Sequence, residues 1–325
     1  MRVVDIHTHL LSKSLKFDRI YDKVALKFFG KRFGIDIKLA KKDPYLAYTT
    51  AFINNIKSSN YLKSAVVFGV DGRFDKDGRF LSKDRSVCAS NDELLNLYKN
   101  NKEILIPFFS INPNRLDALD LIDRYVQLGF KGAKFLQNYW EIDLNSKDLL
   151  PYYKKLKSYN LPLIIHVGSE SSIKSNSKFE SINMIELALN SGVNVIVAHM
   201  ALSYSPKNIF KALSKDPKKF NHEYYLLIDM LSSFDNLYAD ISAILTPIRA
   251  KVLRDLSNRF EVHEKLLYGS DFPVPFTTIF NTHDLSFKKR VEISKVKNPH
   301  DRYIMTILDY FKEDNPIWSN YKKLL

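Results

Sequence analysis

Residues 3–9 of the chain read VVDIHTH, a largely apolar run that ends in two histidines separated by a threonine. In a β-strand, residues i and i+2 point to the same side, so His7 and His9 can direct their imidazoles to one point at the end of the strand. Neutral imidazole is the commonest metal-binding side chain in proteins. The stretch therefore predicts a buried strand that ends in two candidate metal ligands.

Seven more short apolar runs follow, at intervals that leave room for one helix between most of them. They lie at residues 65–68, 104–109, 132–136, 163–167, 193–198, 237–241 and 266–268. The runs are continuous rather than alternating, which is typical of strands buried on both faces of a parallel sheet. Eight strands that alternate with helices predict an α/β protein with the (β/α)8 TIM-barrel fold.

Two of the intervening helices carry clear local signals. Residues 90–93 read SNDE, the pattern of a capping box at a helix N-terminus. A second predicted helix ends before Gly129, a residue that can terminate it. Its apolar face is formed by Leu116, Leu119, Ile122 and Val126.

The gap between the first two predicted strands is too long for one helix. Residues 10–62 contain two stretches with helical apolar spacing, FDRIYDKVALKFF at 17–29 and PYLAYTTAFINNIK at 44–57. The second fits the first barrel helix, so the first is predicted to be a helical insertion after strand 1, on the catalytic face. The expected organisation is a single barrel domain over residues 1–325, in which residues 10–43 form a mobile cover.

Three more of the predicted strands end in an ionisable residue. Strand 5 delivers His166, strand 6 delivers His199 and strand 8 delivers Asp271. The carboxyl ends of barrel strands form one face, so these side chains are expected to converge with His7 and His9. An ionisable side chain is costly to bury without a partner. Four strand ends of this kind favour a shared site over separate core histidines.

Strands 4 and 7 also carry charged residues. Lys134, in GFKGAKF, lies at the matching depth. It either points outward or, if inward, needs a carboxylate, an anionic substrate or a chemical modification as its partner. Asp240, in LYADIS, comes shortly before Thr246, which can cap a helix, and it is interpreted as structural rather than catalytic.

Taken together, these motifs resemble the amidohydrolase superfamily. DIHTH, FFSINPN, GFKGAKF, IIHVG, VIVAHM and LLYGSDFP carry the resemblance, which runs from Val3 to about Pro275. Within the superfamily, the chain is similar to the amidohydrolase-related branch of metal-dependent TIM-barrel hydrolases and decarboxylases, which includes aminocarboxymuconate-semialdehyde decarboxylase. One departure concerns the loop after strand 6, where relatives often continue with Gly-Gly and this chain has Met200 and Ala201.

The resemblance implies one divalent metal ion, usually zinc, held by the residues that match His7, His9, His166 and Asp271. It also implies that His199 polarises or hydrogen-bonds the substrate or a metal-bound water. The residue chemistry agrees, because imidazole and carboxylate ligands suit Zn²⁺. Zinc lowers the pKa of its water toward about 7, and Asp271 can accept the proton. Asp271 and His199 are therefore the candidate catalytic residues.

The resemblance also bears on the number of metal ions. Some superfamily members carry a carboxylated lysine on strand 4 that bridges two metals. Lys134 lies where such a lysine would be, so it is a candidate second-metal or substrate ligand. A single metal is commoner in this branch, so one Zn²⁺ is expected.

Four classes of function are compatible with a site of this kind. The first is a metal-dependent hydrolase of an amide, lactone or ester bond in a small, carboxylated molecule, and the second is a metal-dependent non-oxidative decarboxylase. The third, a TatD-like nuclease, needs a Glu ligand that is missing from the ends of strands 3 and 4. The fourth, a binding protein with a dead site, is disfavoured because every ligand position is filled.

The residues that bind the substrate are unknown at this stage. Four cationic side chains are candidates for a substrate carboxylate, but no motif in the loops names a ligand. They are Arg19, Arg32, Arg73 and Lys134.

Composition and charge restrict the classes of partner that the sequence predicts. Hydrophobic residues make up 45% and charged residues 26% of the chain, which excludes wholesale disorder. The net charge of +13 is spread along the chain without an aromatic-interleaved RNA motif, so a basic solvated surface is favoured over nucleic-acid binding. A small-molecule substrate is the expected partner, and a homodimer is one assembly that the sequence leaves open.

Cysteine usage and hydropathy bear on location. Cys88 is the single cysteine and has no internal disulfide partner, which favours a reducing compartment. No signal peptide is visible, and no apolar run approaches the roughly 18 residues of a spanning helix. A cytoplasmic protein without a membrane partner is expected.

Overall fold

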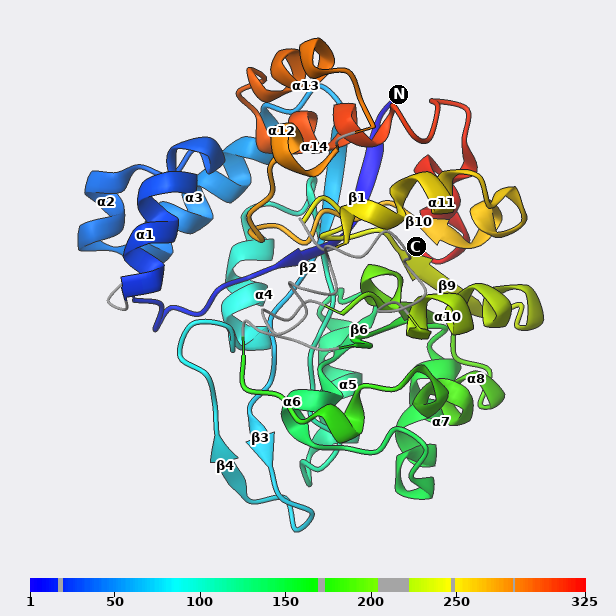
Figure 1. Ribbon diagram of the computed structural model, residues 1–325. Coiled ribbons are helices and arrows are strands. Elements are labelled where there is room, and N and C mark those ends of the chain that lie inside the picture. Colours follow the sequence, from blue (N-terminus) through cyan, green and yellow to red (C-terminus); the bar gives the residue numbers. More distant parts are fainter. Residues whose placement is uncertain (17–19, 169–172, 204–221, 247–248, 283) are drawn as a thin grey trace.

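The computed structural model describes residues 1–16, 20–168, 173–203, 222–246, 249–282 and 284–325 (Figure 1). Each of the eight predicted runs overlaps a strand. These are β1 (Val3–His9), β2 (Leu62–Phe68), β5 (Leu105–Pro107), β6 (Ala133–Phe135), β7 (Leu163–Ile165), β8 (Val195–Val197), β9 (Leu237–Asp240) and β10 (Leu266–Leu267). The sequence did not predict the antiparallel pair β3 (Arg73–Phe74) and β4 (Phe80–Ser82).

The eight strands form two parallel sheets, in the orders β1-β2-β5 and β10-β9-β8-β7-β6. Isolated parallel bridges join the margins of these sheets at Thr8–Phe272 and at Phe109–Ala133. Backbone hydrogen bonds accompany both bridges. The His9 amide donates to the Phe272 carbonyl over 2.8 Å. The chain is therefore an α/β protein built on parallel sheets.

Alternate residues of β2, β7, β8 and β9 belong to different apolar clusters. On β7, Leu163 and Ile165 pack in the large cluster that also contains the helices, whereas Ile164 packs in a second cluster made mainly of strand residues. Burial on both faces explains why these strands appear in the sequence as continuous apolar runs. The second cluster contains Val4, Ile6, Val66, Phe68, Phe108, Ile164, Ile196, Ala198, Tyr238, Leu267 and Leu324.

Helices fill the intervals between the strands. The longer ones are α1 (Ile20–Phe29), α3 (Pro44–Lys57), α4 (Asn91–Lys99), α5 (Ala118–Gln127), α7 (Leu150–Ser158), α10 (His222–Ser233), α13 (Phe287–Ser294) and α14 (Pro299–Ile307). The shorter ones are α2 (Ile37–Lys42), α6 (Gln137–Trp140), α8 (Glu186–Asn190), α11 (Leu253–Ser257) and α12 (Thr278–Asn281). The described residues include no helix that is both long and apolar enough to cross a membrane.

The local helix signals were confirmed at α4 and corrected at α5. Ser90 and Glu93 form the predicted capping box, with both reciprocal hydrogen bonds present. Helix α5 begins at Ala118, so Leu116 precedes it and is 87% exposed. Leu116 lies next to Gly78 in the β3–β4 connection, whose Cβ, if present, would contact it. Tyr125 rather than Val126 lies in the buried face of α5.

Between β1 and α3 the chain forms α1, the 3₁₀ helix η1 (Lys31–Phe33) and α2, grouped at one side of the molecule (Figure 1). The η1 helix ends at Gly34, whose φ of 72° is left-handed. The buried ring of Phe33 lies 5.2 Å from the ring of Phe272, which follows Asp271. The segment thus contacts the chain next to one of the predicted ligands.

Candidate metal centre

His7 and His9 lie at the end of β1, and their side chains point to the same region, as the strand spacing predicted. Both rings pack against the Phe68 ring in T-shaped arrangements, at centroid distances of 4.9 and 4.8 Å. The Nε2 atoms of His7 and His9 lie 3.5 and 3.1 Å from Oδ1 of Asp271. Among the described residues, these three form one of two groups whose ligand atoms all lie within 4.8 Å of one another. The other group is His7, His199 and Asp240.

Asp271 follows β10 and adopts a left-handed backbone conformation, with φ of 63°. Its amide donates to the His7 carbonyl over 2.8 Å, so the backbone of β1 holds the aspartate beside the histidine. Burial by itself would raise the pKa of Asp271, but His9, His7 and Arg249 lower this pKa to about 2. The carboxylate is therefore ionised at neutral pH and can act as a ligand or accept a proton.

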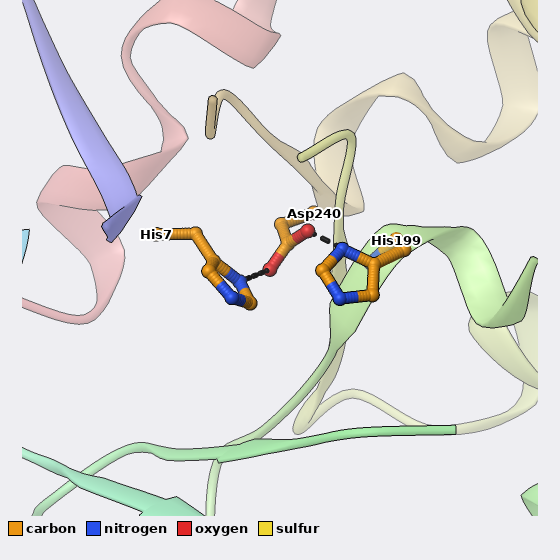
Figure 2. Close-up of side chains that lie close together, drawn as sticks. All are labelled: His7, His199 and Asp240. Atoms are coloured by element: carbon orange, nitrogen blue, oxygen red, sulfur yellow. Dashed lines mark hydrogen bonds and ion pairs between the residues drawn. The ribbon is translucent and has the colours of Figure 1, made fainter. Parts of the chain in front are cut away.

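Asp240, at the end of β9, connects His7 to His199 (Figure 2). Its Oδ2 lies 2.7 Å from His7 Nδ1, and its Oδ1 accepts the His199 amide over 2.8 Å. Burial by itself would raise the pKa of Asp240, but the His7 imidazole and the donors around the carboxylate hold it below the usual value. An ionised Asp240 keeps the proton of His7 on Nδ1 and leaves Nε2 as the metal-binding nitrogen. The residue interpreted as structural from the sequence thus lies inside the site.

His199 lies in the 3₁₀ helix η5 (Ala198–Ala201), directly after β8. Its Nδ1 is 2.7 Å from Ser242 Oγ and 3.9 Å from Asp271 Oδ2. Ser242 Oγ donates to Asp240, so it accepts the Nδ1 proton of His199. This leaves the His199 Nε2 lone pair available. Burial, Arg249 and His7 lower the pKa of His199 well below its ordinary value, so the ring is neutral at pH 7.

The backbone around His199 is strained. His199, Met200 and Ala201 have φ values of 55°, 54° and 54°, a left-handed run without a glycine. Such conformations cost of order 1 kcal/mol or more each for residues other than glycine, and they persist where the surrounding structure enforces them. The run coincides with the positions at which relatives often have Gly-Gly.

His166 and Lys134 are both buried near this cluster. The His166 ring lies 5.2 Å from the His199 ring, but His166 belongs to neither of the two groups described above. Lys134 lies on β6 with its Nζ 5.1 Å from the Phe68 ring, and its positive charge contributes to the lowered pKa of His7, of which burial is the main cause. Lys134 therefore points inward.

Sequence reasoning missed three further residues at the site. Ser242 bonds to both His199 and Asp240, as described above. Asp5 Oδ1 accepts the amides of His7 and Ser270 over 3.1 and 3.0 Å, which holds β1 to the segment after β10. Arg249 is buried and donates to the Leu202 carbonyl. Asp5 belongs to the DIHTH motif and could have been found there, whereas no pattern distinguishes Arg249.

The cationic candidates for a substrate carboxylate lie in different places. Arg73 forms an ion pair with Glu141 at 2.9 Å. Arg32 lines a cavity that none of the candidate metal ligands lines. Arg19 lies outside the described residues. Lys134 alone of the described candidates lies next to the histidines.

The residues at the site fit a metal ion. His7 Nε2 and Asp271 Oδ1 are buried and make no hydrogen bond within the described part of the chain. A buried polar atom is normally satisfied, so two such atoms at one point suit a ligand that binds both. Imidazole nitrogen and carboxylate oxygen are ligands that Zn²⁺ and related divalent metals accept.

Comparison with solved structures shows a shared fold. A probable 2-pyrone-4,6-dicarboxylic acid hydrolase from Acinetobacter baumannii, with citric acid bound, is 14% identical with a TM-score of 0.55, over 100% of this chain and 99% of that chain. A TIM-barrel protein from Bordetella bronchiseptica has the same identity and TM-score, over 94% and 99%. An amidohydrolase from Burkholderia multivorans with bound zinc is 13% identical with a TM-score of 0.51, over 90% and 89%.

A search of curated proteins finds no match. A family model described as amidohydrolase matches residues 4–281. This match spans all the strand ends that carry candidate ligands, from His7 to Asp271. The chain therefore belongs to the amidohydrolase family, a family of metal-dependent TIM-barrel enzymes.

Proposed function

We propose that the protein is a hydrolase that uses a metal-activated water to cleave an amide, lactone or ester bond in a small carboxylated molecule. The observation that carries this proposal is the cluster of the buried His7, the half-buried His9 and the buried, ionised Asp271. In this cluster a base lies within reach of the metal-binding nitrogens. Hydrolysis needs such a base, because water must lose a proton as it attacks.

We assign His7, His9, His166 and Asp271 to one divalent metal, Zn²⁺, which imidazole and carboxylate ligands suit. When bound, the ion acts as a Lewis acid and makes water acidic enough to ionise near neutral pH. Asp240 holds His7 in the tautomer that presents Nε2. His166, directly after β7, is the fourth proposed ligand of the set.

Asp271 and His199 are the proposed catalytic residues. Asp271 accepts the proton of the attacking water and delivers it to the leaving group. His199 is neutral, with Nδ1 bonded to Ser242, so its Nε2 accepts a hydrogen bond from the water or the substrate. Its ring lies 4.9 Å from that of His7, which places this acceptor beside the metal ligands.

Lys134 is the proposed ligand for an anionic group of the substrate. Lys134 is buried with its Nζ 5.1 Å from the Phe68 ring, which both His7 and His9 contact, so its ammonium lies beside the histidines and can bind a substrate carboxylate there. In the two-metal alternative, a carboxylated Lys134 would bridge two ions and His199 would bind the second. Removal of Lys134 would then lower the metal content as well as turnover.

We also propose the architecture that holds the site. The bridges at Thr8–Phe272 and Phe109–Ala133 close the eight strands into a single (β/α)8 barrel. Residues 10–43 form the cover of this one domain, supported by the contact of Phe33 with Phe272. The family match favours this enzyme class over the nuclease.

A substrate panel tests the proposal. The zinc-loaded protein is incubated with lactones, amides and aromatic carboxylates, including 2-pyrone-4,6-dicarboxylate, the compound after which the A. baumannii relative is named. Product analysis and CO₂ release are followed together. Ring opening or amide cleavage without CO₂ is expected. Stoichiometric CO₂ release from an aromatic carboxylate, with no hydrolysis, would establish the decarboxylase alternative instead.

A further inference from the structure

A cavity of about 670 Å³ lies where the ends of α3 and α13 and the first turn of α14 meet η1. No candidate metal ligand lines it, so it is separate from the metal centre. Its lining is rich in cations. They are Lys31, Arg32, Lys295, Lys297 and Arg302.

The positive charge of this lining is not balanced within the described part of the chain. None of the five cations forms an ion pair with a carboxylate there. Asp301 is the one acidic residue in the lining. Its Oδ1 accepts from Ser59 and from the Tyr61 amide, and both oxygens contact the Asn60 amide, just before β2. One carboxylate leaves the five cations of the lining in excess. An uncompensated cluster of cations in a concave surface attracts anions.

The burial of Arg302 is independent evidence that the cavity binds an anion. It is only 4% exposed, yet its two described hydrogen bonds go to carbonyls, those of Val296 at 2.9 Å and Arg32 at 3.1 Å. A guanidinium has five N–H donors, so part of this capacity is unused among the described residues. A buried cation without an acidic partner is costly, and an anion in the cavity would offset that cost.

The neighbours of Arg302 confirm that it lies in a cationic, poorly hydrated environment. Burial, the larger cause, and the adjacent Arg32 together lower the pKa of Arg302 to about 10. The guanidinium also lies 5.3 Å from the ring of Phe276, which supplies attraction from the ring but no negative charge.

We propose that this cavity binds a small, multiply charged, phosphate-bearing anion. Arg302 and the half-buried Arg32 provide planar forks that match phosphate oxygens, and the exposed Lys31, Lys295 and Lys297 provide point charges at the rim. Five cations around one cavity match a group that carries several charges, such as a diphosphate. A concave site formed by three helices suits a small molecule better than an extended nucleic acid, which needs a long basic stripe.

Inorganic pyrophosphate is the probe, titrated calorimetrically into the zinc-loaded protein at low and moderate salt. The double variant Lys295→Gln/Lys297→Gln removes two exposed charges from the rim. The control Lys99→Gln/Lys288→Gln removes two exposed charges elsewhere, on α4 and α13. The rim variant is expected to raise the Kd about tenfold or more, because charge-assisted contacts to the anion are lost. The control is expected to leave the Kd within about twofold.

A further variant separates this cavity from the metal centre, since pyrophosphate can also bind metal ions. His7→Ala should leave the pyrophosphate Kd unchanged. Loss of binding in His7→Ala, or equal weakening in the rim variant and the control, would overturn the proposal. So would a short oligonucleotide that displaces pyrophosphate and binds more tightly. Arg302→Gln should abolish binding, and circular dichroism checks its folding; if it does not fold, the rim variant decides the outcome.

Discussion

Asp271 is proposed both to bind the metal and to transfer a proton, and one substitution separates these two roles. Asn keeps the shape and an oxygen for the metal but accepts no proton at neutral pH. Asp271→Asn should therefore lower kcat by on the order of 10²–10⁴-fold while much of the metal is retained. Elemental analysis and turnover on the same preparation measure both. Asp77→Asn, on the exposed β3–β4 connection, is the matched control. Full activity in Asp271→Asn would remove the proton-transfer role.

We assign Asp240 a positioning role, because its two oxygens bond to the His7 imidazole and to the His199 amide. Asp240→Asn would lose the charge that keeps the His7 proton on Nδ1, and the amide would offer a donor where an acceptor is needed. The affinity for zinc should fall about 10–100-fold. Competition with a chromogenic chelator measures this affinity. An unchanged affinity would show that His7 holds its tautomer without Asp240.

Candidate metal ligands could be predicted from the sequence, whereas a positioning residue such as Asp240 could not. His7, His9 and Asp271 were predictable because each lies within three residues after a continuous apolar run. Asp240 follows such a run too, but its partner His7 lies 233 positions away. Nothing local distinguishes an aspartate that orients a distant imidazole from one that caps a helix.

At the scale of elements, η1 is the contact through which the proposed cover touches the site. Phe33 packs against Phe272 and Phe276, at centroid distances of 5.2 and 6.4 Å. Phe33→Ala should loosen residues 20–42, since a buried aromatic ring contributes about 3–5 kcal/mol to packing. Hydrogen exchange should rise across that segment, and KM should change. Phe28→Ala, an exposed aromatic on α1, is the control. Unchanged exchange in Phe33→Ala would show that the segment is held elsewhere.

The burial of the strands explains which of them could be predicted from the sequence. Strands buried on both faces leave a continuous apolar run that needs no tertiary information. The β3 and β4 strands, of two and three residues, are partly or fully exposed and leave no such run. Leu116 was assigned to α5 because its spacing fits a helix, whereas it lies against the β3–β4 connection. An apolar residue near a helix start can belong to either neighbour.

At the scale of the whole molecule, α14 makes folding pH-dependent through His300. This buried residue lies 3.7 Å from Asp5 on β1 and packs on Phe272 after β10. Burial lowers the pKa of His300 from 6.5 to about 4. Between these values the unfolded chain binds the proton and the folded chain does not. The stabilising contribution is therefore complete above about pH 6.5 and is lost as the pH falls to about 4.

Denaturant unfolding of the metal-free protein from pH 7 to pH 4 measures this effect. The free energy of unfolding should fall by about 1.4 kcal/mol per pH unit more in the wild type than in His300→Gln, which has no imidazole to titrate. His222→Gln, at an exposed position on α10, should keep the wild-type slope. Parallel curves for the wild type and His300→Gln would mean that His300 titrates alike in both states.

The backbone hydrogen bond from Asp271 to His7 joins segments that are far apart in the sequence, and this has a consequence for biosynthesis. His7 and His9 leave the ribosome early, but the backbone bond from Asp271 to His7 cannot form until the segment after β10 has been made. During translation the two histidines are an incomplete chelating pair, with none of the neighbours that later select the tautomer of His7. Metal binding at this site must therefore wait until the segment after β10 has been made, and the ions available at that moment decide which one the finished enzyme carries.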